Sequence, residues 1–161
     1  MNKYTNTLLK AIYFPVRGRS KGLAVPTLEF EGKKYPVTET IMGRDSVGLV
    51  KRVSVTIHRG EKMYIFKMFY RYNFSWPQSR AAKECHKDSR WRGDILVFLE
   101  GERVDYVGIV DWKQRSLARR AVSEFLTEAQ ECIEDAKAAG EGEGEPQFPL
   151  ELAFEIEGGA E

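Results

Sequence analysis

The stretch LVKRVSVTIHRGEKMYIFKMFYRY, residues 49–72, decides the fold. Apolar and polar residues alternate through Leu49–Ile57 and again through Lys62–Tyr72, and a period of two is that of a β-strand. Between the two runs, His58-Arg-Gly-Glu61 supplies the glycine that a tight turn favours. The sequence therefore predicts one long antiparallel hairpin.

Patterns on either side of this hairpin predict an α+β fold, with an antiparallel β-sheet built from hairpins and one long C-terminal helix. Two further hairpins are expected, one from Thr27–Gly32 with Lys33–Val37 and one from Asp94–Leu99 with Arg103–Trp112. Three helices are expected, over residues 2–14, from a Ser79 cap through Asp88, and from Ser116 to Ala139. The last of these carries a continuous apolar stripe at helical spacing.

The length of 161 residues suits one domain. We expect that domain to occupy residues 1–139, because the run GEGEGEP at 140–146 is a low-complexity acidic linker. Residues 140–161 would then form an acidic, Gly- and Glu-rich tail that is partly disordered. Within that tail, Pro149–Ile156 is compatible either with a terminal strand or with disorder.

Charge is distributed unevenly along the chain. Residues 1–120 hold 24 of the 25 lysines and arginines but 12 of the 24 acidic residues, whereas Lys137 is the single base in residues 121–161. The formal net charge of +1 therefore conceals a basic part and an acidic part. Such asymmetry indicates a polyanionic partner for the basic part. It also predicts that the acidic tail folds back over the basic surface and competes with phosphate.

The most basic segment, residues 51–92, is also rich in aromatic residues. Single-stranded nucleic acid is held by this combination, because aromatic rings stack on bases while lysine and arginine neutralise phosphates. The opposite interpretation, that these aromatics form the core of the sheet, is equally compatible with the sequence. The predicted contacts with DNA or RNA are Arg52, Arg59, Lys62, Lys67, Arg71, Tyr72, Trp76, Arg80, Lys83, Lys87, Arg90, Trp91, Arg92, Arg115 and Arg119.

Residues 93–136 suggest a second possibility, since Gly93-Asp94 opens one strand and Asp111-Trp-Lys113 stands at the end of the next. This stretch resembles the PD-(D/E)xK nuclease superfamily. The resemblance implies that Asp94 and Asp111 bind Mg²⁺, that Lys113 positions the attacking water or stabilises the phosphate, and that Glu84 serves as a third carboxylate. Carboxylate oxygens are the ligands that Mg²⁺ prefers, and the metal would activate water.

A third possibility is a protein-interaction domain whose basic half meets an acidic protein. Unless the chain is a nuclease that uses Mg²⁺, we expect no cofactor. No apolar run approaches the roughly 18 residues that cross a bilayer, and the first residues make a poor signal peptide, so we expect no membrane partner. Two cysteines need no disulfide framework, and an intracellular protein of the cytoplasm or nucleus is expected. An exposed aromatic sheet face would also allow two chains to pair as a homodimer.

Overall fold

The computed structural model describes residues 3–43, 49–101, 106–139 and 146–157. The strands are β1 (Lys3–Phe14), β2 (Lys21–Phe30), β3 (Lys33–Pro36), β4 (Lys51–Arg59), β5 (Lys62–Tyr72), β6 (Gly93–Glu100), β7 (Tyr106–Val107) and β8 (Glu151–Ile156). The helices are α1 (Glu39–Met42), α2 (Arg80–Cys85) and α3 (Trp112–Ala138).

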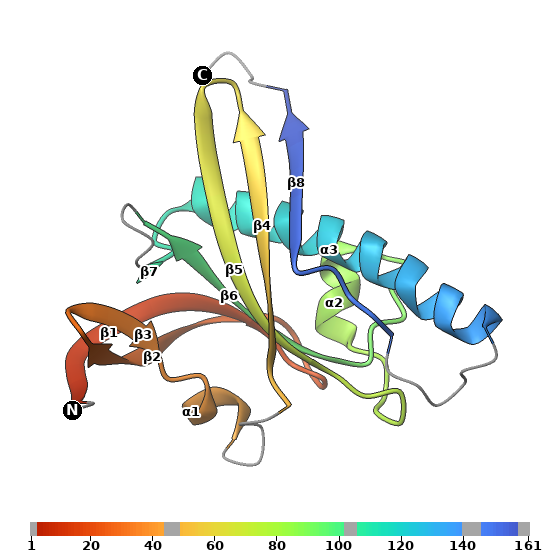
Figure 1. Ribbon diagram of the computed structural model, residues 1–161, viewed down its shortest axis with the longest axis horizontal. Coiled ribbons are helices and arrows are strands. Elements are labelled where there is room, and N and C mark those ends of the chain that lie inside the picture. The colour runs from red at the N-terminus through yellow and green to blue at the C-terminus, as the bar shows by residue number, and fades with distance from the viewer. Residues whose placement is uncertain (1–2, 44–48, 102–105, 140–145, 158–161) are drawn as a thin grey trace.

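Within the described residues, the strands form one sheet in the order β3-β2-β1-β6-β5-β4-β8, and β7 pairs with the end of β6. Every pair is antiparallel except β4 with β8, which run parallel. The expected α+β class is confirmed, although the parallel β8 makes the sheet mixed. Figure 1 shows β1, β2 and β3 crossing the direction of β4, β5 and β8, so the sheet is strongly twisted.

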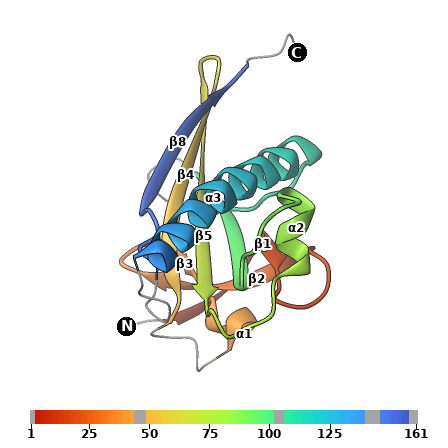
Figure 2. The ribbon, with the colours of Figure 1, turned by 90° about the vertical axis from the view of Figure 1, so that its right-hand side faces the viewer.

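The predicted central hairpin is β4 with β5, paired from Lys51 opposite Tyr70 to Arg59 opposite Lys62. Its turn contains Gly60 at φ +61°, in the left-handed region that favours glycine. The tip of this hairpin projects beyond the rest of the molecule, with β8 beside it (Figures 1 and 2). The predicted Lys33–Val37 hairpin strand is present as β3, and the turn before it includes Glu31 and Gly32, both at positive φ.

The long helix α3 packs on one face of the sheet, which we call the helix face. Apolar residues of β4, β5 and β6 on this face meet the buried stripe of α3, which includes Leu117, Val122 and Phe125. The helix begins at Trp112, four residues before the expected start, because Asp111 and Gln114 form a capping box. No helix in the described ranges is long and apolar enough to span a membrane.

A second, smaller core lies on the opposite face of the sheet. It joins Leu9, Val25 and Phe98 to Met42 of α1. The twist carries β3 round to lie against β7, across this opposite face. The two sides of the sheet are therefore different, since one is covered by α2 and α3 and the other carries the short α1 and is partly enclosed by the sheet itself.

The helix expected over residues 2–14 is wrong, because β1 occupies Lys3–Phe14. In this strand Leu9 and Ala11 enter the smaller core, whereas Ile12 and Phe14 enter the core under α3. A strand buried on both faces has apolar residues at odd and even positions, and these reproduce helical spacings by coincidence.

Two other expectations change at the ends of elements. The strand expected over Arg103–Trp112 is limited to Tyr106–Val107 among its described residues, and Asp111 and Trp112 belong to the start of α3. Residues 102–105 lie outside the described part of the chain, as do 140–145 and 158–161 of the expected tail. The sheet also continues past the expected domain boundary at residue 139, because β8 pairs with β4 and Phe154 packs on the main core.

Candidate nucleic-acid interface

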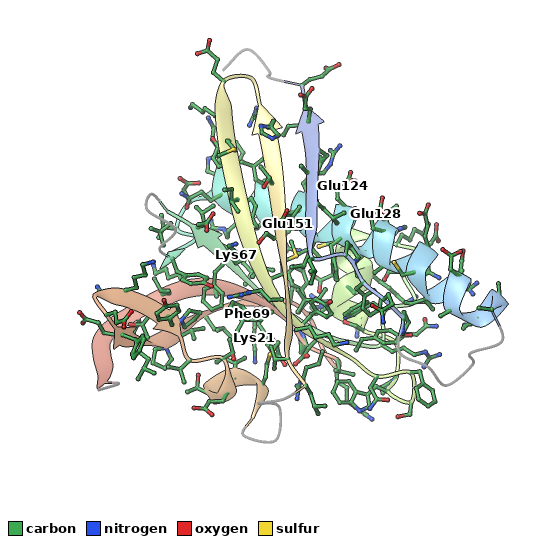
Figure 3. The ribbon with its side chains drawn as sticks, in the orientation of Figure 1. Lys21, Lys67, Phe69, Glu124, Glu128 and Glu151 are labelled. Atoms are coloured by element: carbon green, nitrogen blue, oxygen red, sulfur yellow. The ribbon has the colours of Figure 1, made fainter. Side chains whose placement is uncertain are left out.

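A groove of about 720 Å³ lies at the edge of the sheet around the beginning of β4, which pairs with β5 but precedes the residues that pair with β8. Four basic side chains and two tyrosines that line it come from four different strands: Lys33 and Tyr35 of β3, Lys51 and Arg52 of β4, Lys67 of β5 and Tyr106 of β7. We call this the basic groove. Figure 3 shows Lys67 and Phe69 on β5, with Glu151, which also lines the groove, at the start of β8.

Local contacts hold the groove side chains in place. Lys67 Nζ donates to Ser54 Oγ at 2.6 Å and lies 3.6 Å from Glu100 Oε1. Arg52 hydrogen-bonds to the Tyr106 hydroxyl, and although burial raises the pKa of Tyr106, this guanidinium acts to lower it. Arg52 and Lys67 are therefore held in place at the groove.

Two acidic residues, Glu100 and Glu151, also line the groove. Against four bases they leave its lining with a net positive charge. Glu151 belongs to the C-terminal segment, and the chain just before it forms one wall of the groove through Pro146, Gln147 and Phe148.

Sequence reasoning placed Arg52 and Lys67 among the contacts, and the structure brings them together in the basic groove. It did not name Lys51, although this residue lies in the predicted basic segment, and it missed Lys33, Tyr35 and Tyr106, because only the twist of the sheet carries β3 and β7 beside β4. The available signal was that Lys33 and Tyr35 stand two residues apart, and so on one face, in a predicted strand.

Arg71 lies on the same side of β5 as Lys67, but it is engaged in a largely buried ion pair with Asp94. Its Nη2 lies 2.6 Å from Asp94 Oδ2 and its Nε donates to Oδ1 at 3.0 Å, while the Tyr13 hydroxyl donates to Oδ2 at 2.7 Å. The guanidinium stacks on Trp76 at 5.2 Å. Arg92 Nη1 donates to the Trp76 carbonyl at 2.7 Å. These three predicted contacts, Arg71, Trp76 and Arg92, therefore hold the loop after β5 in place.

Trp91 does not offer a stacking surface, because it is 1% exposed in the core under α3. Tyr72 packs against it with ring centroids 5.0 Å apart, and Phe148 contacts both rings. Burial raises the pKa of Tyr72. For these two aromatics the structure matches the interpretation in which they form core.

The remaining predicted bases lie in two places away from the groove. Arg59 and Lys62 flank the tip of the β4–β5 hairpin, about 17 Å along the strand from Lys67. The others lie on or next to the two helices that cover the helix face: Arg80, Lys83, Lys87 and Arg90 in or after α2, and Arg115 and Arg119 in the first turns of α3. The predicted set therefore does not form one continuous surface.

The three residues proposed for metal-dependent catalysis lie on opposite sides of the sheet. Asp94 is completely buried, and it alternates with Leu96 and Phe98 of the smaller core. Asp111 instead caps α3 on the helix face, where its Oδ1 accepts from Gln114 N at 2.7 Å, and Lys113 follows in the first turn. Glu84, the suggested third carboxylate, is bound by Ser20 and Arg119. Within the described ranges, no three His, Cys, Asp or Glu residues are grouped as metal ligands.

Comparison of the chain with protein-family models, with curated proteins and with solved structures gave no match.

Proposed function

We propose that this protein binds single-stranded nucleic acid in the basic groove. The observation that carries the proposal is the convergence of Lys33, Lys51, Arg52 and Lys67 with Tyr35 and Tyr106 around one concavity. Cations that neutralise phosphates and rings that stack on bases are the two parts of a single-strand site.

The shape of the groove favours an unpaired strand over a duplex. Tyr35 is 40% exposed and offers an open ring, whereas Tyr106 is half-buried and its ring packs against Phe69 and Phe98. Bases of a duplex are stacked on one another, whereas bases of a single strand can turn into such a site. Each base stacked on a ring contributes roughly 1–3 kcal/mol, so stacking on Tyr35 adds to the phosphate contacts.

The acidic segment beside the groove supports a regulatory part of the proposal. Glu151 lines the groove in the position of a competing anion, and β8 is held there by its pairing with β4. The carboxylate weakens phosphate binding without closing the groove.

The test is fluorescence anisotropy with labelled single-stranded and duplex DNA and RNA over a salt series, with Mg²⁺ or with EDTA. Single strands are expected to bind more tightly than duplexes, with an affinity that falls steeply as salt rises. Arg52→Glu should weaken single-strand binding at least tenfold. Lys62→Glu, which makes the same charge change at the tip of the same hairpin, should weaken it less than threefold.

Equal effects of the two variants would contradict the groove as the binding site. Absence of binding to every oligonucleotide at low salt would overturn the proposed function and favour an acidic protein partner. Cleavage that requires Mg²⁺ would instead favour the nuclease alternative.

A further inference from the structure

On the helix face, the loop that joins β1 to β2 is tied to both helices. Ser20 N and Oγ donate to the two carboxylate oxygens of Glu84, each at 2.8 Å, and Arg119 Nη2 donates to Ser20 Oγ at 2.9 Å. Arg119 Nη1 also lies 3.5 Å from Glu84 Oε1, and its guanidinium lies over Phe14. Figure 2 shows this loop, α2 and the N-terminal half of α3 on one side of the molecule.

These three segments are strongly basic. Residues 17–20, 80–85 and 112–120 hold eight lysines and arginines and one acidic residue, Glu84. That carboxylate accepts hydrogen bonds from Ser20 and is paired with Arg119, so its negative charge is largely offset within the surface itself. Although partial burial acts to raise the pKa of Glu84, these contacts lower it below its usual value, and the group stays ionised in this role. We call the surface formed by these three segments the helix-side surface.

A cleft of about 260 Å³ opens in the helix-side surface between β1, β2 and the start of α3. Lys10 and Arg115 line it together with apolar residues and Gly22, and no carboxylate is among the described residues around it. Trp112, the first residue of α3, precedes Arg115 by three residues and is 70% exposed. Trp112, Arg115 and Arg119 share one face of α3, because they are spaced three and four residues apart.

We infer that the helix-side surface is a second contact site for the same nucleic acid, where it binds the phosphodiester backbone and Trp112 stacks on a base. This inference rests on the proposed function. Phosphates fit the surface because its cations are accompanied by a single acid, Glu84, which is already paired within the surface. An exposed indole close to arginines along a helix can stack on a base. A strand long enough to reach both sites gains affinity from the two linked contacts.

A length series of single-stranded homopolymers from 5 to about 40 nucleotides tests this, with the double variant Lys10→Ala/Arg115→Ala, which removes the two basic side chains of the cleft. The variant should bind the longest oligomer at least tenfold more weakly and the shortest one normally. The slope of log affinity against log salt should also decrease by about 0.7 for each phosphate of the single strand that the variant no longer neutralises. The control is Lys62→Ala/Lys137→Ala, which removes two positive charges elsewhere, one of them from the other end of α3. It should change the long-oligomer affinity less than threefold.

Trp112→Phe gives an independent readout, because Trp91 is buried and Trp76 is covered by Arg71. Quenching of the intrinsic fluorescence by the long oligomer should be largely abolished in this variant. Unchanged quenching and unchanged long-oligomer affinity in the helix-side variants would overturn the second site. If Arg52→Glu still weakened binding in that case, the groove would stand alone. If instead only the helix-side variants weakened binding, the groove proposal would fail while this surface remained.

Discussion

Arg71 and Asp94 face each other across β5 and β6 in a two-point ion pair, with Nη2 2.6 Å from Oδ2 and Nε 3.0 Å from Oδ1. The Tyr13 hydroxyl donates to the same carboxylate, so one buried acid joins side chains from β1 and β5 to β6. Burial and the neighbouring carboxylate raise the pKa of Tyr13, which keeps its hydroxyl a donor. Asp94 therefore holds three strands together.

Asp94→Asn should lower the free energy of unfolding by about 3 kcal/mol, because Arg71 loses its counter-charge in a mostly buried site. Urea denaturation measures this. Glu124→Gln is the control, since it breaks an exposed pair with Arg120 at 3.8 Å and should cost roughly 0.5 kcal/mol or less. A stabilisation by Mg²⁺ that disappeared in Asp94→Asn would instead favour a metal site at this residue.

Gly93→Ala should prevent normal folding or reduce stability by more than about 4 kcal/mol. A Cβ at this position would lie 1.7 Å from the Arg71 carbonyl oxygen, which is backbone and is fixed by the pairing of β5 with β6. Gly22→Ala is the matched control, because its nearest neighbour would lie 3.9 Å away. Thermal unfolding followed by circular dichroism compares the two. Similar melting temperatures would contradict the close approach of the strands.

Asp111→Ala should cost about 1 kcal/mol of stability because α3 would then have no side-chain cap. Asp111→Asn should be nearly neutral, since asparagine caps a helix equally well. The midpoint of urea denaturation measures both changes. Equal stabilities of the two variants would contradict the cap, and loss of Mg²⁺-dependent cleavage in both would favour a metal-ligand role.

Glu151→Gln should tighten binding of single-stranded nucleic acid about threefold at low salt. A unit charge roughly 7 Å from a phosphate in water costs about 0.6 kcal/mol, which corresponds to that factor. Glu155→Gln is the control. Glu155 lies on the same side of β8 as Glu151, but it stands opposite His58 of β4 in the strand register, near the hairpin tip and away from the groove. Substitution is preferable to truncation here, since Phe148 packs against the main core. Equal effects of the two variants would mean that Glu151 acts only through net charge.

Cys85 should be protected from alkylation at moderately alkaline pH. Burial raises the pKa of this thiol to about 11, whereas an unfolded cysteine has a pKa near 8.5. Its contribution to stability is therefore complete below about pH 8.5 and is lost as pH rises toward 11. In a Cys132→Ser background, iodoacetamide should react at pH 8.5 roughly 100-fold more slowly with the folded than with the unfolded protein. Mass spectrometry follows the reaction, and similar rates would show that the thiol is not buried.

Four features follow from the sequence, because each depends on local periodicity or on a single turn or cap residue. They are the β4–β5 hairpin, the hairpin at Lys33, the Ser79 cap and the long helix. Ser79 Oγ does accept from Ala82 N, as expected of an N-cap. The strand β1 does not follow in this way. Its residues enter two different cores, and only the packing on both sides distinguishes it from an amphipathic helix.

The features of the candidate site divide in the same way, into those that the sequence predicts and those that depend on the fold. Composition by itself determined that the first 120 residues are basic and that aromatic residues accompany the charge. Only the tertiary structure decided that Trp91 is core, that Arg71 is paired with Asp94, and that Lys33 joins Arg52 in one groove. The physical reason is that burial and charge pairing depend on which strands become neighbours, and the order β3-β2-β1-β6-β5-β4-β8 is set by contacts between residues far apart in the chain.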